Sequence, residues 1–132
     1  MQHPRDVLQG PQAAATAIPV CDHYSGAPDR MQKSLQLQAA MTAEFGVCVF
    51  DVTLDCEDGA AVGAEAEHAA LVAQLVRGAA PEARVAARVH PVNHPAFSGD
   101  VATIAGEAGH RLCHVMLPKC ESVDDVLAAE RA

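Results

Sequence analysis

The sequence predicts an α/β fold built from about four βα units. Short segments rich in apolar and β-branched residues alternate four times with segments of helical period between residues 13 and 132. Glycines stand where three of the helical segments should end, at Gly46, Gly78 and Gly109. Repeated βα units form parallel sheets with right-handed crossovers, so we expect four parallel strands in sequential order with the helices outside.

The first unit should follow a polar leader. Residues 1–12 contain two prolines and a glycine and lack an apolar stretch, so we expect a disordered or frayed leader there. Residues 13–21, AAATAIPVC, are predicted as a short first strand, and residues 22–27 as a polar turn. Pro28 suits the start of a helix that should continue to Phe45.

The second and third units have the same order. Residues 47–54, VCVFDVTL, form a β-rich run without clean alternation, which is typical of a strand buried on both faces of a parallel sheet. An acidic turn at residues 55–59 leads to a helix predicted from Ala64 to Arg77. Residues 84–89 are the third predicted strand.

The fourth unit follows a loop rich in His, Pro and Asn. A third helix is predicted near residues 100–108, and a fourth strand at residues 114–117. Ser122 and Asp125 have the spacing of a capping box and should begin a fourth helix, which is still in progress at Ala132.

The positions of the polar residues favour a barrel over an open sheet. An open flavodoxin-like sheet also fits the alternation. However, polar clusters come directly after the second, third and fourth predicted strands, at residues 55–58, 88–94 and 119–121. Active sites of (β/α)8 barrels are built at such carboxyl ends. We therefore expect residues 13–132 to be the N-terminal half of a TIM-type (β/α)8 barrel, truncated in its fourth helix.

Composition excludes several classes of function. Seventeen Asp and Glu against nine Lys and Arg give a charge of −8, whereas a nucleic-acid surface needs a basic footprint. The five cysteines are odd in number and have no CxxC spacing, which favours a reducing compartment over a disulfide framework. No stretch approaches the ~20 apolar residues of a membrane span. We expect a cytoplasmic protein with a small-molecule substrate and neither nucleic acid nor membrane as partner.

Four short motifs resemble those of one family, in its order. Residues 50–59, FDVTLDCEDG, resemble its LDLEDGV strand end, and residues 84–93, RVAARVHPVN, resemble its RVN strand. Residues 116–122, MLPKCES, match LPKVES with one substitution, and residues 28–33, PDRMQK, resemble the PDRxxKA start of its first helix. Over residues 18–132 the chain thus resembles the citrate lyase β-subunit and malyl-CoA lyase (HpcH/HpaI aldolase) superfamily.

The resemblance implies a Mg²⁺-dependent carbon–carbon lyase that acts on a CoA ester such as citryl-CoA or malyl-CoA. In such reactions a divalent cation stabilises the enolate, and a guanidinium holds the carboxylate or carbonyl of the other fragment. Arg88 is the predicted clamp, and Glu57 and Asp58 are implied to line the catalytic site. Either acid could hold Arg88 in place, while Asp55 should cap or orient. A purely structural ion pair is the alternative for Arg88.

Four further residues are candidates for substrate binding. The resemblance places Lys119 and Glu121 at the barrel mouth, and it suggests that Arg30 and Lys33 contact CoA phosphates. A solvated loop or helix face is the alternative for each. The first loop, DHYSGAP, is less basic than the family's PGDRP, so a small keto acid, as in a pyruvate-type aldolase, is an alternative substrate.

No residue of this chain is predicted to bind Mg²⁺, because the family's two acidic ligands come after the position where this sequence ends. Glu57 and Asp58 should at most touch metal-bound water. A zinc site made by His90 and His94 with Cys113 and His114 is an alternative. Prolines beside the first two histidines, however, prevent the helix that would bring them together.

Two hypotheses of different class remain. The chain is either a segment of a carbon–carbon lyase, or a non-catalytic remnant or partner-dependent half-barrel. A half-barrel would leave two strand edges unpaired and would expose the apolar inner faces of its strands. We therefore expect the chain alone to self-associate, as a homo-oligomer or an aggregate, and to show no lyase activity.

Overall fold

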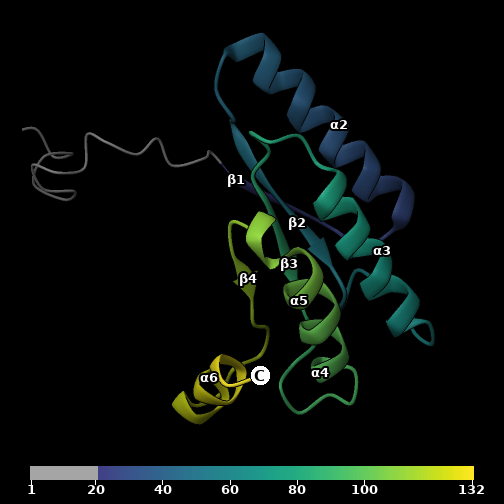
Figure 1. Cartoon of the computed structure of the whole chain (residues 1–132), viewed down its shortest axis with the longest axis vertical. Helices are drawn as coiled ribbons and strands as arrows, with labels where there is room; N and C mark the ends of the chain where they lie inside the picture. Colours follow the sequence, from purple (N-terminus) through teal and green to yellow (C-terminus); the bar gives the residue numbers. More distant parts are fainter. Residues whose placement is uncertain (1–20) are drawn as a thin grey trace, which may run out of the picture.

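The computed structural model describes residues 21–132, which form a four-stranded parallel sheet with helices packed on one face (Figure 1). Each strand is hydrogen-bonded to its neighbour in the sequence, in the order β1-β2-β3-β4. The strands are β1 (Cys21–Ser25), β2 (Phe50–Asp55), β3 (Val85–Arg88) and β4 (Val115–Met116). The predicted α/β class and sequential strand order are confirmed, and this order is the one that consecutive units of a TIM-type barrel have.

Two regular helices and one irregular helical segment connect the strands, and a third regular helix follows β4. The regular ones are α2 (Pro28–Phe45), α3 (Glu65–Gly78) and α6 (Val123–Glu130). The irregular segment runs through α4 (Phe97–Asp100), the π-helical turn η1 (Val101–Ala105), α5 (Gly106–Ala108) and the 3₁₀ turn η2 (Gly109–Arg111). None of the helices within residues 21–132 has the length and apolar character needed to cross a membrane.

The first strand lies later in the sequence than predicted. β1 occupies residues 21–25, most of the segment predicted as a polar turn, while residues 13–20 and the predicted leader lie outside the described part of the chain. The segment is a strand because its polar side chains have partners on β2. The Thr53 hydroxyl donates to both carboxylate oxygens of Asp22, at 2.9 and 2.7 Å. Long-range hydrogen bonding thus overrides a local pattern that is typical of a turn.

Helix boundaries follow the predicted signals, with one exception. Gly46 ends α2 in the left-handed conformation, with φ of 71°, and its N–H donates to the Thr42 carbonyl at 2.9 Å. Ser122 and Asp125 form the predicted capping box at the start of α6. Gly109, by contrast, does not stop the third helix, because it has a helical φ of −55° and the chain continues into η2.

The two faces of the sheet differ in chemistry. All six residues of β2 are buried, as predicted for a strand covered on both faces. Val52 and Leu54 pack under the helices with core residues of α3 and β3, such as Val72 and Val85. Asp51, Thr53 and Asp55 alternate with them and therefore lie on the opposite face. In a complete barrel that face would point inward, and we call it the inner face.

The expectation of exposed apolar inner faces is wrong, because side chains on this inner face form cross-strand polar pairs. Arg84 of the segment before β3 pairs with Asp51, and Arg88 pairs with Asp55 two layers further along. Thr53 and Asp22 form the layer between them. The inner face is thus a stack of hydrogen-bonded layers.

Candidate functional site

The pair formed by Asp55 and Arg88 is the centre of the candidate site. The sheet register sets these residues side by side at the carboxyl ends of β2 and β3. Arg88 Nε donates to Asp55 Oδ1 at 2.7 Å, and Nη2 donates to Oδ2 at 2.6 Å. The same carboxylate accepts the backbone N–H groups of Glu57 at 2.9 Å and Gly59 at 2.8 Å. Asp55 therefore both caps the β2–α3 loop and orients Arg88, a holding role that we had expected of Glu57 or Asp58.

Electrostatics keep this pair charged. Burial by itself raises the pKa of the Asp55 carboxyl, but the hydrogen bonds from Arg88 and from the two backbone N–H groups outweigh burial, so the pKa is lowered. The hydrogen bond to Asp55 in turn raises the pKa of Arg88. Arg88 is therefore a fixed cation whose side chain is 20% exposed at the end of the sheet.

The acidic loop after β2 joins this pair to the loop after β4. Lys119 Nζ contacts a carboxylate oxygen of Glu57 and lies 3.2 Å from Asp58 Oδ1. Arg88 Nη1 lies 3.5 Å from Glu57 Oε2 and 3.9 Å from Asp58 Oδ2. The structure thus brings together four residues that the sequence singled out, from three different βα units. It does so at the strand ends where barrel enzymes place their chemistry.

The backbone at Lys119 is strained. Its φ is 54°, and it is the only residue other than glycine with positive φ among residues 21–132. A side chain in this left-handed region costs roughly 1–2 kcal/mol. Strain of this kind concentrates at functional positions, where the surrounding structure holds it in place.

The remaining predicted binding residues are spread more widely. Arg30, in the first turn of α2, lines the pocket in front of Arg88. Lys33 is exposed on α2 and does not line that pocket. Glu121 is exposed, and its backbone N–H donates to Asp125 Oδ2 at the start of α6. Within the described residues its side chain makes no ion pair with the cluster.

A pocket of about 390 Å³ opens at the mouth of the sheet. This volume falls in the range of small-molecule sites. Its walls come from β1 and the loops after β1 and β2, with Arg88 and Arg30 as the cationic groups. The lining residues are His23, Tyr24, Ser25, Gly26, Ala27, Arg30, Asp55, Asp58, Gly59 and Arg88.

Tyr24 is a site residue that the sequence reasoning missed. Its ring lies under the Arg88 guanidinium, with 5.4 Å between Arg88 Cζ and the ring centroid, and its hydroxyl donates to Met116 Sδ at 2.8 Å. It was missed because residues 22–27 were assigned to a turn. Residues 21–25, CDHYS, show no alternation of apolar and polar residues that could have indicated a strand.

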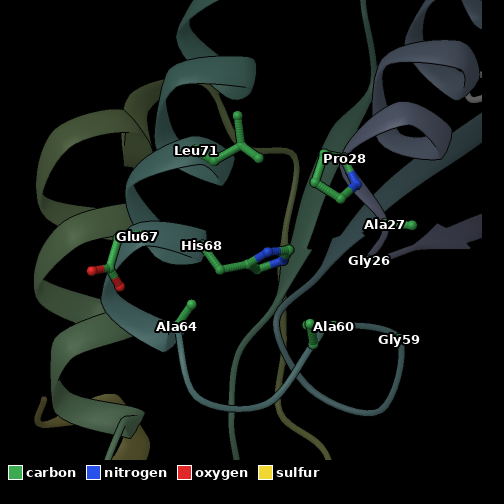
Figure 2. A pocket seen from close by; sticks show the side chains of 10 residues that line it. Gly26, Ala27, Pro28, Gly59, Ala60, Ala64, Glu67, His68 and Leu71 are labelled. Atoms are coloured by element: carbon green, nitrogen blue, oxygen red, sulfur yellow. The ribbon is translucent and has the colours of Figure 1, made fainter.

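A second pocket, of about 570 Å³, lies beside the first and is mainly apolar (Figure 2). His68 projects from α3 toward the loops after β1 and β2, and its Nε2 lies 2.9 Å from the Asp55 carbonyl oxygen. Gly26, Ala27 and Gly59 line both pockets. The lining of the second pocket is Gly26, Ala27, Pro28, Gly59, Ala60, Ala61, Ala64, Glu67, His68 and Leu71.

The mouth residues do not amount to a Mg²⁺ site by themselves. The carboxylates of Asp55, Glu57 and Asp58 all face Arg88 or Lys119. One buried carboxylate oxygen, Glu57 Oε2, has no hydrogen-bond partner within residues 21–132. A single such oxygen fits contact with a metal-bound water, whereas Mg²⁺ itself demands six oxygen ligands in octahedral geometry.

The alternative zinc site, made by His90 and His94 with Cys113 and His114, is not formed either. His90 Nδ1 lies 2.7 Å from Asp100 Oδ2, and its ring stacks on His94 with centroids 4.2 Å apart. These histidines follow the carboxyl end of β3, whereas Cys113 and His114 precede the amino end of β4. The two pairs therefore lie toward opposite ends of a parallel sheet.

Comparison with known proteins agrees with the architecture. The chain is similar to a solved citrate lyase structure from Burkholderia xenovorans LB400, with a TM-score of 0.74 and 40% sequence identity. The match covers 86% of this chain and 34% of that one, so this chain spans about a third of that structure's length. No protein-family model and no curated protein matches the chain. The described residues have a citrate lyase-like fold, and the chain is related to lyases.

Proposed function

We propose that residues 21–132 supply the N-terminal part of a Mg²⁺-dependent carbon–carbon lyase site that acts on a CoA ester such as citryl-CoA or malyl-CoA. The observation that carries this proposal is the state of Arg88. Asp55 binds its Nε and Nη2, whereas Nη1 makes no hydrogen bond among the described residues and lies 3.5 Å from its nearest carboxylate oxygen, Glu57 Oε2. Nη1 can therefore donate to a substrate carboxylate while Asp55 holds the guanidinium still.

The reaction requires proton transfers as well as charge stabilisation. In cleavage, the substrate hydroxyl loses its proton and the carbon–carbon bond breaks. This gives a carbonyl fragment and a thioester enolate, which then takes up a proton at carbon. In this proposal Arg88 holds the carboxylate of the carbonyl fragment, and Glu57 Oε2, buried and without a hydrogen-bond partner, accepts the hydroxyl proton. Mg²⁺, when bound, would act as a Lewis acid on the developing enolate, and we assign none of the described residues as its ligand.

The two pockets favour a CoA ester over a free keto acid. The mouth pocket, with Arg30 and Arg88, suits a small anionic acyl group. The adjoining apolar pocket at α3 suits the pantetheine arm of CoA, because a mainly apolar cleft binds a long, thin and uncharged chain. A pyruvate-type aldolase would have no use for this second pocket.

A chimaera provides the test. The segment of the Burkholderia citrate lyase that aligns with residues 21–132 is replaced by these residues, and cleavage of citryl-CoA and malyl-CoA is measured with Mg²⁺ present. Aldol cleavage of a 4-hydroxy-2-keto acid is measured in parallel. The parent lyase is the control for assay conditions, and circular dichroism verifies that the chimaera folds.

We expect the chimaera to cleave at least one of the two CoA esters and to prefer it over the keto acid. Preference for the keto acid would assign the site to a pyruvate-type aldolase. A folded chimaera without any turnover, beside an active parent, would favour the non-catalytic remnant.

A further inference from the structure

A second cluster of reactive side chains lies near the opposite, amino end of the sheet. Asp51, Cys113 and His114 each offer one ligating atom, and these atoms all lie within 4.8 Å of one another. Asp51 is the second residue of β2, whereas Cys113 and His114 directly precede β4. The Cys113 N–H donates to the Val85 carbonyl at 2.8 Å, which fixes this segment against β3.

The distance between the cysteine and the histidine matches that of a metal-bound pair. Cys113 Sγ lies 3.5 Å from His114 Nδ1. Zinc bound tetrahedrally, with Zn–S of about 2.3 Å and Zn–N of about 2.05 Å, places S and N about 3.6 Å apart. The Asp51 oxygen lies within 4.8 Å of both atoms, whereas tetrahedral zinc would place it about 3.4–3.6 Å from each, so each separation has to shorten by about 1.4 Å at most.

A neighbouring arginine holds Asp51 in orientation, and a carboxylate lies near His114. Arg84 Nε and Nη2 donate to the two oxygens of Asp51, at 2.5 and 3.0 Å. The Nε2 atom of His114 lies 3.7 Å from Asp22 Oδ2 and leaves Nδ1 facing the thiol. Asp22 is itself fixed by the Thr53 hydroxyl. A carboxylate on the far nitrogen of a histidine is the usual outer partner of a metal-bound imidazole.

We propose that Asp51, Cys113 and His114 bind one divalent transition-metal ion of the zinc type, with the fourth position open to water. A thiolate and an imidazole select such ions over Mg²⁺ or Ca²⁺, which prefer oxygen ligands. The charges balance, because the Asp51 carboxylate and the Cys113 thiolate neutralise the ion while Asp22 offsets Arg84. This site is separate from the mouth cluster, since Asp51 precedes Asp55 by four residues along β2.

Binding has to displace the thiol proton. Burial, and to a lesser degree the neighbouring Asp51 carboxylate, raises the pKa of the Cys113 thiol, so the thiol is protonated at neutral pH when no cation is bound. One proton is therefore released to solvent for each ion bound.

Titration of the full chain with Co²⁺ tests the site, because a thiolate bound to Co²⁺ gives a charge-transfer absorption in the near ultraviolet. We expect this band to saturate at one ion per chain and to disappear when Zn²⁺ displaces Co²⁺. Cys113→Ser should abolish the band and keep the fold, since serine can still donate to the Val85 carbonyl that Cys113 Sγ contacts. Asp22→Asn should leave the band but weaken Co²⁺ affinity roughly 10–100-fold.

Cys120→Ser is the matched control. Cys120 is an exposed cysteine after β4, toward the carboxyl end of the sheet, and its replacement should leave both band and affinity unchanged. A band that survives in Cys113→Ser, or that is lost equally in Cys120→Ser, would overturn the proposal. So would the absence of a thiolate band from the wild-type chain at saturating Co²⁺.

Discussion

The Asp55 carboxylate binds the Arg88 guanidinium through two parallel hydrogen bonds and at the same time accepts two backbone N–H groups of the loop that follows β2. Four donors thus converge on one carboxylate that is only 2% exposed. The pair joins the carboxyl ends of β2 and β3 and fixes the loop that carries Glu57 and Asp58. Stability and site geometry therefore depend on the same residue.

Replacing Asp55 with Asn should destabilise the chain by about 3 kcal/mol, because Arg88, only 20% exposed, loses the one carboxylate that accepts its hydrogen bonds and keeps only Glu57 and Asp58, at 3.5 and 3.9 Å. Chemical unfolding monitored by circular dichroism measures the loss. Asp51→Asn is the matched control: its partner Arg84 is 44% exposed, so we expect a loss of about 1 kcal/mol or less. Equal losses of unfolding free energy in the two variants would contradict the prediction that the more buried Asp55–Arg88 pair contributes more to stability than the Asp51–Arg84 pair.

The same pair predicts a pH dependence of stability. The pKa of Asp55 is lowered on folding, so its contribution is fully present above the unfolded pKa of about 3.9 and is lost as pH falls through the folded value. The difference in unfolding free energy between wild type and Asp55→Asn should be constant from about pH 5 to pH 7 and should shrink below about pH 4. A difference that grows on acidification would contradict the lowered pKa.

The contact between Gly26 and Gly59 makes a separate prediction. A Cβ atom on Gly26 would meet the backbone of Gly59 and would lie 2.6 Å from Ala60 N, so Gly26→Ala must push the two loops apart. We expect a loss of roughly 1–3 kcal/mol, measured by thermal unfolding. Gly106→Ala is the control, since a Cβ there meets nothing within 4 Å and α5 gains helix propensity of about 0.5–1 kcal/mol. A well-tolerated Gly26→Ala would mean that the loops are not in close contact in solution.

Features that depend on local sequence patterns could be predicted from the sequence. Gly46 and the Ser122 box marked helix boundaries, and the acidic turn and Arg88 marked the end of the sheet that carries the candidate site. β1 was misplaced because the partners of Asp22 and Tyr24, namely Thr53 and Arg88, lie about 30 and 64 residues away in the chain. A strand made of such residues has no local apolar signal to identify it.

The partner of Arg88 could not be predicted for a similar reason. Asp55, Glu57 and Asp58 are all close in sequence, and only the register of β2 against β3 decides which carboxylate lies opposite the guanidinium. The polar inner face was missed although β2 alternates apolar and polar residues from Phe50 to Asp55. The run predicts a strand buried on both faces, and all six residues of β2 are indeed buried. Three of them, however, are polar and lie on one face.

The left-handed backbone at Lys119 predicts that two substitutions there differ in stability but not in activity. Lys119→Gly should be more stable than Lys119→Ala by about 1 kcal/mol, because glycine adopts a φ of 54° without strain. Both variants lose the contacts with Glu57 and Asp58, so both should lower activity equally in the chimaera with the Burkholderia lyase. Thermal unfolding and turnover measured on the same preparations separate the two effects. Equal stability of the two variants would show that the backbone relaxes in solution.

The geometry of Arg88 gives the sharpest test of the proposed chemistry. Arg88 donates from Nε and Nη2 to Asp55, and in the proposed site Nη1 donates to the substrate. A single ammonium group cannot bind both partners with this geometry. In the chimaera, Arg88→Lys should therefore lower kcat by about 100-fold or more although the charge is kept, and Arg88→Ala should lower it by at least as much. Arg84→Lys is the control, because Arg84 lies at the other end of the sheet and pairs with Asp51 away from the mouth pocket. If Arg88→Lys retained wild-type kcat and KM while losing only stability, Arg88 would be a structural ion pair and the carboxylate clamp would have to be another residue.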